Sequence, residues 1–181
     1  MLISVAICTW NHSALLRQTL EQFTHLVIPP ELEWELLVVN NNSTDATDDV
    51  IASFIGRLPI RRLFEPRPGL SNARNTAVRE ARGEYLLWTD DDSFVDERWL
   101  AAYAEAFVRW SKATVFGGPI RPWFATPPPQ WLKRVWPMVS GVYGFRDLGS
   151  IPLRFDGSAR MPFGANFAWS DVSYSMLCRN S

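Results

Sequence analysis

The chain has 181 residues, of which 47% are hydrophobic, and its 18 Lys and Arg residues nearly balance 19 Asp and Glu residues. This length suits one compact domain, and a formal net charge of -1 argues against a dedicated nucleic-acid binder. No apolar run approaches the roughly 18 residues of a membrane span, and the N-terminus lacks the basic start of a signal peptide, so we expect a cytoplasmic protein. Two cysteines and two histidines form no zinc pattern, so any metal should be held by oxygen ligands.

Apolar runs alternate with helical patterns along the first part of the chain. Strands are predicted at 3–9, 34–39, 60–64, 84–89 and 114–116, the third of them at a sheet edge. Apolar residues at helical spacing predict helices around 15–23 and 50–55, over 70–81, and from a cap at Asp96 to Phe107. This order predicts an α/β fold with a mainly parallel central sheet and helices on both faces.

The pattern breaks after Gly117, where six prolines punctuate a loop-rich segment with at most one short helix, at 130–135. Within it, Lys133 and Arg134 lie beside Trp131 and Trp136. Tryptophan and basic side chains suit a membrane surface or a lipid-linked acceptor. The alternative is a proline-ordered loop that packs over a cleft.

The acidic run Asp90-Asp91-Asp92 directly follows the fourth strand. Ligands of open parallel sheets bind beyond the carboxyl ends of the strands. Three adjacent carboxylates at the end of a buried strand repel one another unless a cation compensates them. Because Mg²⁺ is typically bound by one or two carboxylates plus substrate phosphates, the run suggests metal-assisted diphosphate binding. The alternative is a solvated acidic turn at the start of the next helix.

Other polar residues follow the first three strands. The loop that contains Asn40, Asn42 and Asp45 can present amides and a carboxylate to a base or a ribose, and it can also cap the next helix. Arg67 and Arg74 could bind phosphate bidentately or could be surface charges. No glycine-rich phosphate turn follows the first strand, which excludes a Rossmann dinucleotide fingerprint and a P-loop.

Taken together, the motifs resemble those of family-2 glycosyltransferases with the GT-A, Rossmann-like fold. The matching stretches, within residues 3–168, are 5–11, 37–47, 69–75, 81–85, 89–92 and Gly164–Ala168. The resemblance implies transfer of a sugar from a nucleoside diphosphate donor to a saccharide or lipid-linked acceptor, with inversion and aided by Mg²⁺ or Mn²⁺. It also implies that residues 1–118 bind the donor and that residues 119–181 form the acceptor side, with peripheral contact to the inner face of a membrane.

The resemblance also assigns site residues. Asp90 and Asp92 match the metal-binding positions, with Asp92 the first choice, and Asp90 and Asp91 would face ribose or metal. Arg74 matches an arginine near the nucleotide, and Thr9 and Asn11 match the donor-binding end of the first strand. Asn40 departs from the pattern, because many relatives have there an aspartate that accepts a hydrogen bond from uracil. The base of the donor therefore stays open.

A transferase of this kind needs a carboxylate that deprotonates the acceptor hydroxyl. In the family this base usually comes from an acidic pair well beyond the glycine–asparagine segment, and no such pair precedes Ser181. Either the C-terminal part is truncated or altered in frame, which is the interpretation that we favour, or a nearby residue such as Asp171 or Asp156 serves as the base. Two other functions stay open, an inactive nucleotide-sugar-binding remnant and a metal-dependent nucleotidyl or phosphoryl transferase.

Overall fold

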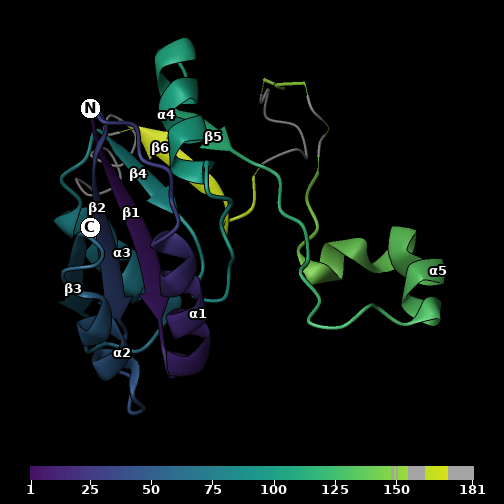
Figure 1. The fold of residues 1–181 in the computed structure, drawn as a ribbon, viewed down its shortest axis with the longest axis horizontal. Coiled ribbons are helices and arrows are strands. Elements are labelled where there is room, and N and C mark those ends of the chain that lie inside the picture. The colour runs from purple at the N-terminus through teal and green to yellow at the C-terminus, as the bar shows by residue number, and fades with distance from the viewer. Residues whose placement is uncertain (148, 150, 155–161, 171–181) are drawn as a thin grey trace.

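The computed structural model describes residues 1–147, 149, 151–154 and 162–170 (Figure 1). In chain order the elements are β1 (Leu2–Thr9), α1 (Ser13–Phe23), β2 (Glu33–Asn40), α2 (Thr47–Phe54), β3 (Ile60–Phe64), α3 (Leu70–Glu80), β4 (Tyr85–Trp88), α4 (Trp99–Arg109), β5 (Val115–Gly117), α5 (Gln130–Val139), the 3₁₀-helix η1 (Ser140–Tyr143) and β6 (Phe167–Ser170). One sheet holds the strands in the order β3-β2-β1-β4-β6-β5. The pairs among β1, β2, β3 and β4 are parallel, which confirms the mainly parallel sheet.

Side chains alternate between the two faces of the sheet and build a core on each. On one face, Ile3, Val5 and Ile7 of β1 pack with buried side chains of α1, α2 and α4. On the other face, buried side chains of β1, β2 and β4 pack with Ala73 and Ala77 of α3. Helices cover both faces, as predicted, because successive residues of a strand point to opposite sides.

Two elements differ from the prediction. β6 lies antiparallel between β4 and β5, where the sequence predicts no strand, so β5 does not neighbour β4. A four-residue strand after a long loop has no periodic pattern that identifies it, and its partners lie far back in the chain. α5 continues to Val139 although Pro137 lies inside it, whereas the prediction ends this helix at 135. Proline normally breaks a helix, so pattern reasoning ends the helix too early.

A polar cluster ties the amino ends of the strands together, at the edge opposite to the loops that follow them. The Ser4 hydroxyl donates to Glu35 Oε1 at 2.6 Å and accepts from the backbone N–H groups of Arg82 and Gly83 at 3.1 and 2.9 Å. Arg61 Nη1 donates to Glu35 Oε2 at 2.7 Å. Gly83 lies so close to β1 that a Cβ would stand 2.5 Å from Ser4 N. The Arg82-Gly83 motif therefore holds the start of β4 against β1.

A small aromatic lobe, defined as residues 123–146, contains α5 and η1 and is set apart from the α/β body in Figure 1. Backbone hydrogen bonds between Ile120 and Arg146, of 2.6 and 2.8 Å, close its base. Its interior contains the Trp136 ring, which lies 5.6 to 6.2 Å from the rings of Phe124 and Tyr143. None of the helices in the described part of the chain is long and apolar enough to cross a membrane. The boundary between 1–118 and 119–181 stays a prediction.

Candidate functional site

Loops that follow the first four strands of the chain meet at one edge of the sheet. The register places Thr9 of β1 beside Asn40 of β2, and Ala6 of β1 beside Trp88 of β4. The segments 10–12, 41–46, 65–69 and 89–98 therefore leave the sheet at the same edge. The predicted donor and metal residues lie in these loops, at the ends of β1 and β2, or in α3. This edge is where open parallel sheets bind ligands.

Asn11 links the loop after β1 to the loop after β2. Its φ of 55° is left-handed, a conformation that asparagine tolerates better than most residues. Its Oδ1 accepts from Thr44 N at 2.7 Å, and its backbone N–H donates to Ser43 Oγ at 3.0 Å. Asn42 also has a left-handed φ, of 61°, and is exposed. The structure therefore brings the predicted residues Asn11 and Asn42 into one pair of loops.

Asp45 fastens the same two loops to the helices that follow them. Its Oδ2 accepts from Ser13 N at 3.0 Å, and its Oδ1 accepts from the backbone N–H and the hydroxyl of Thr47. Burial raises the pKa of Asp45, but the hydrogen bonds from Thr47 and Ser13 outweigh burial and lower the pKa to about 2. Asp45 is therefore ionised at neutral pH and satisfies N–H groups at the starts of α1 and α2. The N-cap residue of α2 is Ala46, so Asp45 caps the helix from one position earlier than an N-cap residue, and its contact with the donor stays a prediction.

Asn40 is buried, and both ends of its amide are engaged inside the loop. Its Oδ1 accepts from Ser43 N at 2.8 Å, and its Nδ2 donates to Asp48 Oδ1 at 2.8 Å. Asp48 in turn binds Arg62 through two hydrogen bonds of 2.7 and 2.6 Å, and Arg62 lowers its pKa. The Asn40 amide therefore holds the loop in shape. Its predicted contact with a nucleotide base stays a prediction.

Three hydroxyl groups, those of Thr9, Thr89 and Ser170, are buried without a hydrogen-bond partner in the described part of the chain, and the first two lie at this edge of the sheet. Thr9 Oγ1 lies at the end of β1, and Thr89 Oγ1 directly follows β4. Both residues are only 3% exposed. A buried hydroxyl without a partner is rare in proteins and is a feature of ligand sites as well as of ordered-water sites. The prediction of Thr9 as a donor-binding residue is compatible with this geometry.

The three acidic residues after β4 have different environments. Asp91 is only 8% exposed, and both of its carboxylate oxygens lie 3.3 Å from His12 Nδ1. The Thr19 hydroxyl donates to the backbone oxygen of Asp91 at 2.9 Å, which ties the acidic loop to α1. Asp90 is partly buried, whereas Asp92 is exposed, and its carboxylate has no ion pair or hydrogen bond to the described residues.

Asp90 lies between the other carboxylates and Arg74 of α3. The Arg74 Nη2 atom is 3.9 Å from Asp90 Oδ1, and its guanidinium lies 5.7 Å from the centre of the Trp88 ring. Burial raises the pKa of Asp90, Arg74 opposes this, and the carboxylates of Asp92 and Asp91 add to it, so the pKa lies above its ordinary value. A second cation beside Asp90 and Asp92 would relieve this repulsion.

The residues of this loop fit a hard divalent cation. Asp90 and Asp92 offer carboxylate oxygens alone, which is the donor type that Mg²⁺ and Mn²⁺ prefer. The described ranges contain no group of three or more His, Cys, Asp or Glu side chains that could enclose a metal ion. A cation at Asp90 and Asp92 would therefore take its other ligands from water or from a bound diphosphate, as Mg²⁺ commonly does.

Arg74 also connects the acidic loop to the Gly164–Ala168 motif. A Cβ on Gly164 would stand 3.0 Å from Arg74 Nη2, so the absence of a side chain allows the guanidinium to lie against this backbone. Asn166 of the same motif has a structural role. Its Oδ1 accepts from Trp99 Nε1 at 2.9 Å and from the Tyr103 hydroxyl at 2.8 Å, and its Nδ2 donates to Pro119 O at 2.8 Å. The amide of Asn166 therefore anchors the motif to α4 and leaves Gly164 beside Arg74.

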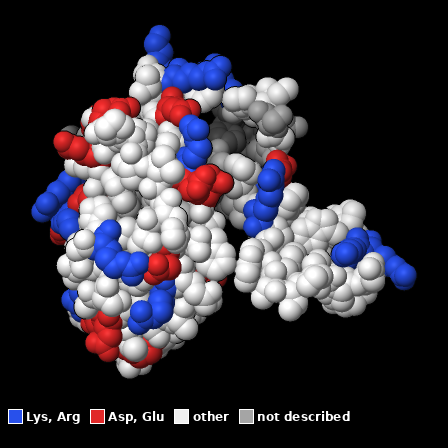
Figure 2. All heavy atoms as spheres, in the orientation of Figure 1, with Lys and Arg blue, Asp and Glu red and all other residues white. Residues whose placement is uncertain are grey.

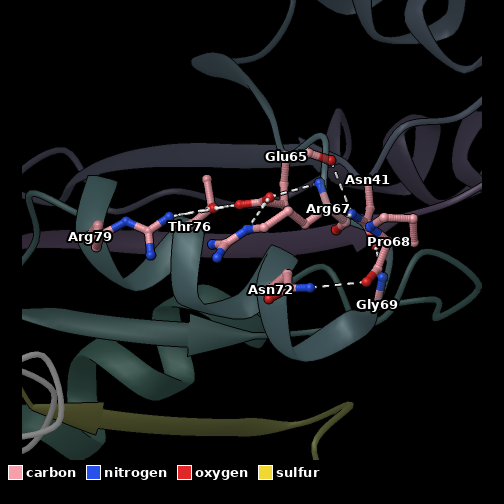
Figure 3. Close-up of polar contacts among 8 residues, drawn as sticks. All are labelled: Asn41, Glu65, Arg67, Pro68, Gly69, Asn72, Thr76 and Arg79. Carbon is pink, nitrogen blue, oxygen red and sulfur yellow. Dashed lines mark hydrogen bonds and ion pairs between the residues drawn. The ribbon is translucent and has the colours of Figure 1, made fainter. Parts of the chain in front are cut away.

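Asn41 and Glu65 form a network that the sequence did not single out (Figure 3). Asn41 Nδ2 donates to the carbonyl oxygens of Glu65 and Arg67 at 3.0 and 2.7 Å, and its Oδ1 accepts from Gly69 N at 2.8 Å. The Asn41 amide thus shapes the loop that precedes α3. The signal available in the sequence was the run of three asparagines after β2, which is read most simply as a turn.

Glu65 extends this network to α3. The Thr76 hydroxyl donates to Glu65 Oε2 at 2.6 Å, and Arg67 donates to Oε1 from its backbone N–H at 2.9 Å and from Nε at 3.2 Å. The hydrogen bond from Thr76, followed by those from Arg67, lowers the pKa of Glu65 to about 2. Arg67, a predicted phosphate-binding candidate, is therefore paired with Glu65, whereas Arg74 lies on the same helix as Thr76 and faces Asp90.

Comparisons with known proteins place these features in context. The family model described as Glycosyl transferase family 2 matches residues 4–162. The succinoglycan biosynthesis protein ExoM of Rhizobium meliloti is 24% identical over 133 residues, which cover 72% of this chain and 42% of that protein. Validoxylamine A glucosyltransferase of Streptomyces hygroscopicus subsp. limoneus is 37% identical over 91 residues, which cover 49% of this chain and 20% of that protein. The chain thus spans less than half the length of these relatives.

Solved structures confirm the fold. S. aureus TarS 1-349 superposes with a TM-score of 0.72 at 20% identity, over 99% of this chain and 49% of that chain. TarS 1-349 in complex with UDP-GlcNAc superposes with a TM-score of 0.60 at 25% identity, over 72% and 37% of the two chains. The mannosyltransferase PcManGT from Pyrobaculum calidifontis, in complex with GDP-Man and Mn²⁺, gives a TM-score of 0.69 at 21% identity, over 97% and 46%. The predicted bases Asp171 and Asp156 lie outside the described residues.

Proposed function

Because the chain belongs to glycosyl transferase family 2, we propose that it moves a sugar from a nucleoside diphosphate donor to an acceptor hydroxyl, with inversion and with the help of a divalent cation. The observation that carries the proposal is the group formed by Asp90, Asp92 and Arg74 at the carboxyl end of β4. Carboxylates that hold a cation and an arginine that binds phosphate are together the groups that a diphosphate needs.

In this proposal, Asp90 and Asp92 hold Mg²⁺ or Mn²⁺, which when bound offsets the charge that builds on the leaving diphosphate. Arg74 binds a phosphate oxygen, because its planar guanidinium can donate two parallel hydrogen bonds and lies beside Asp90. Asp91, fixed by His12 and by the loop contact to Thr19, faces the ribose or the metal.

The remaining predicted donor residues surround the nucleoside. Thr9 ends β1, and Asn11, Asn42 and Asp45 lie on the two loops after β1 and β2, which hydrogen bonds hold together. We propose that exposed Asn42 and the buried hydroxyl of Thr9 contact the donor, while Asn11 and Asp45 keep the loops in place. Asn40 acts in the same way as Asp45, since its amide is already bound inside the loop.

The acceptor hydroxyl needs a base, and Asp171 remains our candidate for it. Sugar donors linked to UDP or GDP are both proposed, since TarS and PcManGT are described in complex with UDP-GlcNAc and with GDP-Man. The acceptor is proposed to be a saccharide or a lipid-linked saccharide, as in the assembly of a cell-surface polysaccharide. We further propose a cytoplasmic location, with peripheral contact to the inner face of a membrane.

The test is calorimetric titration of UDP and of GDP into the protein, with and without Mn²⁺, together with assays for sugar transfer and donor hydrolysis. We expect binding that depends on Mn²⁺, and a D92N variant that loses at least about tenfold in affinity, because a carboxylate ligand becomes a neutral amide. E31Q is the matched control, since Glu31 is also exposed but precedes β2, at the opposite edge of the sheet. Mn²⁺-independent binding that D92N leaves unchanged would contradict the proposal.

The products separate the two other functions. Metal-dependent binding of UDP or GDP without transfer or hydrolysis of any donor supports a binding remnant. Release of inorganic pyrophosphate from a nucleoside triphosphate supports a nucleotidyl transferase. Release of UDP or GDP from a nucleotide sugar, dependent on Mn²⁺ and lost in D92N, supports the glycosyltransferase.

A further inference from the structure

Helix α5 carries apolar side chains on two opposite faces, and only one face is covered. Leu132 is 4% exposed, and Trp136 lies against Phe124 in the interior of the aromatic lobe. On the outer face, Trp131 and Met138, which are two helical turns apart, are 61% and 86% exposed. Val142 of η1 continues this outer face with an exposed fraction of 87%. A helix that is apolar on a face without a partner marks an interaction surface.

The aromatic lobe also differs from the rest of the chain in its balance of basic and acidic residues. The lobe, residues 123–146, contains three of the 18 Lys and Arg residues and none of the 19 Asp and Glu residues. The rest of the chain therefore has fifteen basic residues against nineteen acidic ones. Lys133 and Arg134 lie on α5 and are both exposed, and Figure 2 shows blue side chains at the outer end of an otherwise white lobe. The complementary surface is apolar and negatively charged.

We propose that the outer face of α5 and η1 binds the surface of an anionic lipid bilayer. Trp131, Met138 and Val142 enter the headgroup region. Tryptophan is favoured there because its ring is largely apolar and its N–H group can still form a hydrogen bond. Arg134, three residues after Trp131 on the same side of the helix, faces the lipid phosphates and strengthens binding to an anionic surface. Lys133 lies on the covered side, where it lines a hollow with Leu132 and Trp136. Helix α5 lies along the interface rather than across it, consistent with its length of 10 residues.

The inference deepens one part of the proposed function, the peripheral membrane contact. It rests on the proposed function only for the reason why the protein would bind a membrane. A lipid-linked acceptor would be presented at the same surface to which the lobe binds. The binding itself requires neither donor nor metal, since none of the donor or metal residues lies in the lobe. Membrane binding and donor binding can therefore be measured separately on the same protein.

The test is co-sedimentation of the full chain with vesicles made of equal parts phosphatidylglycerol and phosphatidylcholine, and with vesicles of phosphatidylcholine alone. We expect stronger binding to the anionic vesicles, which added salt weakens. The double variant W131S-M138S should lower the partition coefficient at least about tenfold, because two large apolar side chains are lost from the interface. Val108 of α4 is 75% exposed but lies outside the lobe, so V108S is the matched control and should bind as the wild type does.

A second pair of variants tests the charge. R134Q should bind anionic vesicles roughly fivefold more weakly and with less dependence on salt, whereas the control R17Q on α1 should not. Titration of UDP with Mn²⁺ into every variant keeps the two proposals apart, since all of them should retain the donor affinity of the wild type.

Three results would overturn the inference. The first is a wild-type chain that does not sediment with anionic vesicles, and the second is equal sedimentation of W131S-M138S and V108S. The third is a concentration-dependent dimer, seen by sedimentation velocity without lipid, that W131S-M138S abolishes while vesicle binding is absent. That last result would assign the outer face of α5 to a second copy of the chain.

Discussion

Gly83 offers a sharp test of whether the Arg82-Gly83 motif is structural, as its position at the edge opposite to the loops after β1 and β2 indicates. In a G83A variant, the new Cβ would stand 2.5 Å from Ser4 N, 2.8 Å from Leu2 O and 2.9 Å from Ile3 C. Favourable contacts between carbon and other heavy atoms lie at about 3.5 Å or more, so β1 and the start of β4 would have to separate by about 1 Å. All three obstructing atoms belong to the backbone of a central strand, which cannot rotate away as a side chain can.

The size of the effect follows from what this separation disrupts. The hydrogen bonds from Gly83 N to Ser4 Oγ and from Glu84 N to Leu2 O, both 2.9 Å, cross the gap that must widen. A hydrogen bond contributes about 1 kcal/mol, and overpacking a tight site costs about 1–3 kcal/mol. We therefore expect G83A to lower the free energy of unfolding by about 3 kcal/mol. For a chain of this size, the melting temperature should fall by roughly 6–12 °C.

The assay is thermal denaturation followed by circular dichroism, with G141A as the matched control. A Cβ on Gly141 meets nothing within 4 Å, and its backbone φ is not in the left-handed region, so G141A should melt close to the wild type. At a temperature where both variants are folded, UDP should bind G83A as it binds the wild type. A G83A protein that melts within about 1 °C of the wild type, or one that is stable but has lost UDP binding, would refute this reasoning.

Two further predictions concern the network around α3. The pKa of Glu65 is about 2 in the folded protein, which is below the pKa of this residue in the unfolded chain. The Glu65 carboxylate therefore stabilises the fold above its unfolded-state pKa, and this stabilisation is lost as the pH falls through its folded-state pKa. In urea denaturation, an E65Q variant should be less stable than the wild type at neutral pH, and its stability should change less between about pH 5 and pH 2. If the stability of E65Q depends on pH as that of the wild type does, the Glu65 carboxylate does not stabilise the fold in this way. An R74K variant should bind UDP at least about tenfold more weakly, with little change in melting temperature. Lysine cannot replace the flat guanidinium that lies between Asp90 and Trp88. If calorimetry shows that R74K retains the affinity for UDP, Arg74 is not part of the donor site.

Local patterns in the sequence were enough to predict the layout of the α/β body. The strands from β1 to β4 and the helices between them follow from runs and spacings of apolar residues, because burial on a sheet face or a helix face imposes a short repeat on the chain. The edge at which the loops after these strands gather follows as well, since parallel strands joined by helices all end on the same side. The sequence therefore predicts that the acidic residues after β4 share this edge with the loops after β1 and β2.

Contacts between distant segments settled the roles of individual side chains. Asn40 and Asn41 are neighbours of the same type, yet one binds Asp48 of α2 and the other shapes the loop before α3. Asp91 is enclosed while Asp92 is exposed, because α1 packs His12 and Thr19 against only one of them. Such differences arise from partners that are far apart in the sequence and meet only when the sheet forms, and no local repeat encodes them. The same holds for β6, whose place between β4 and β5 depends on which strand edge is left open after the parallel strands have paired.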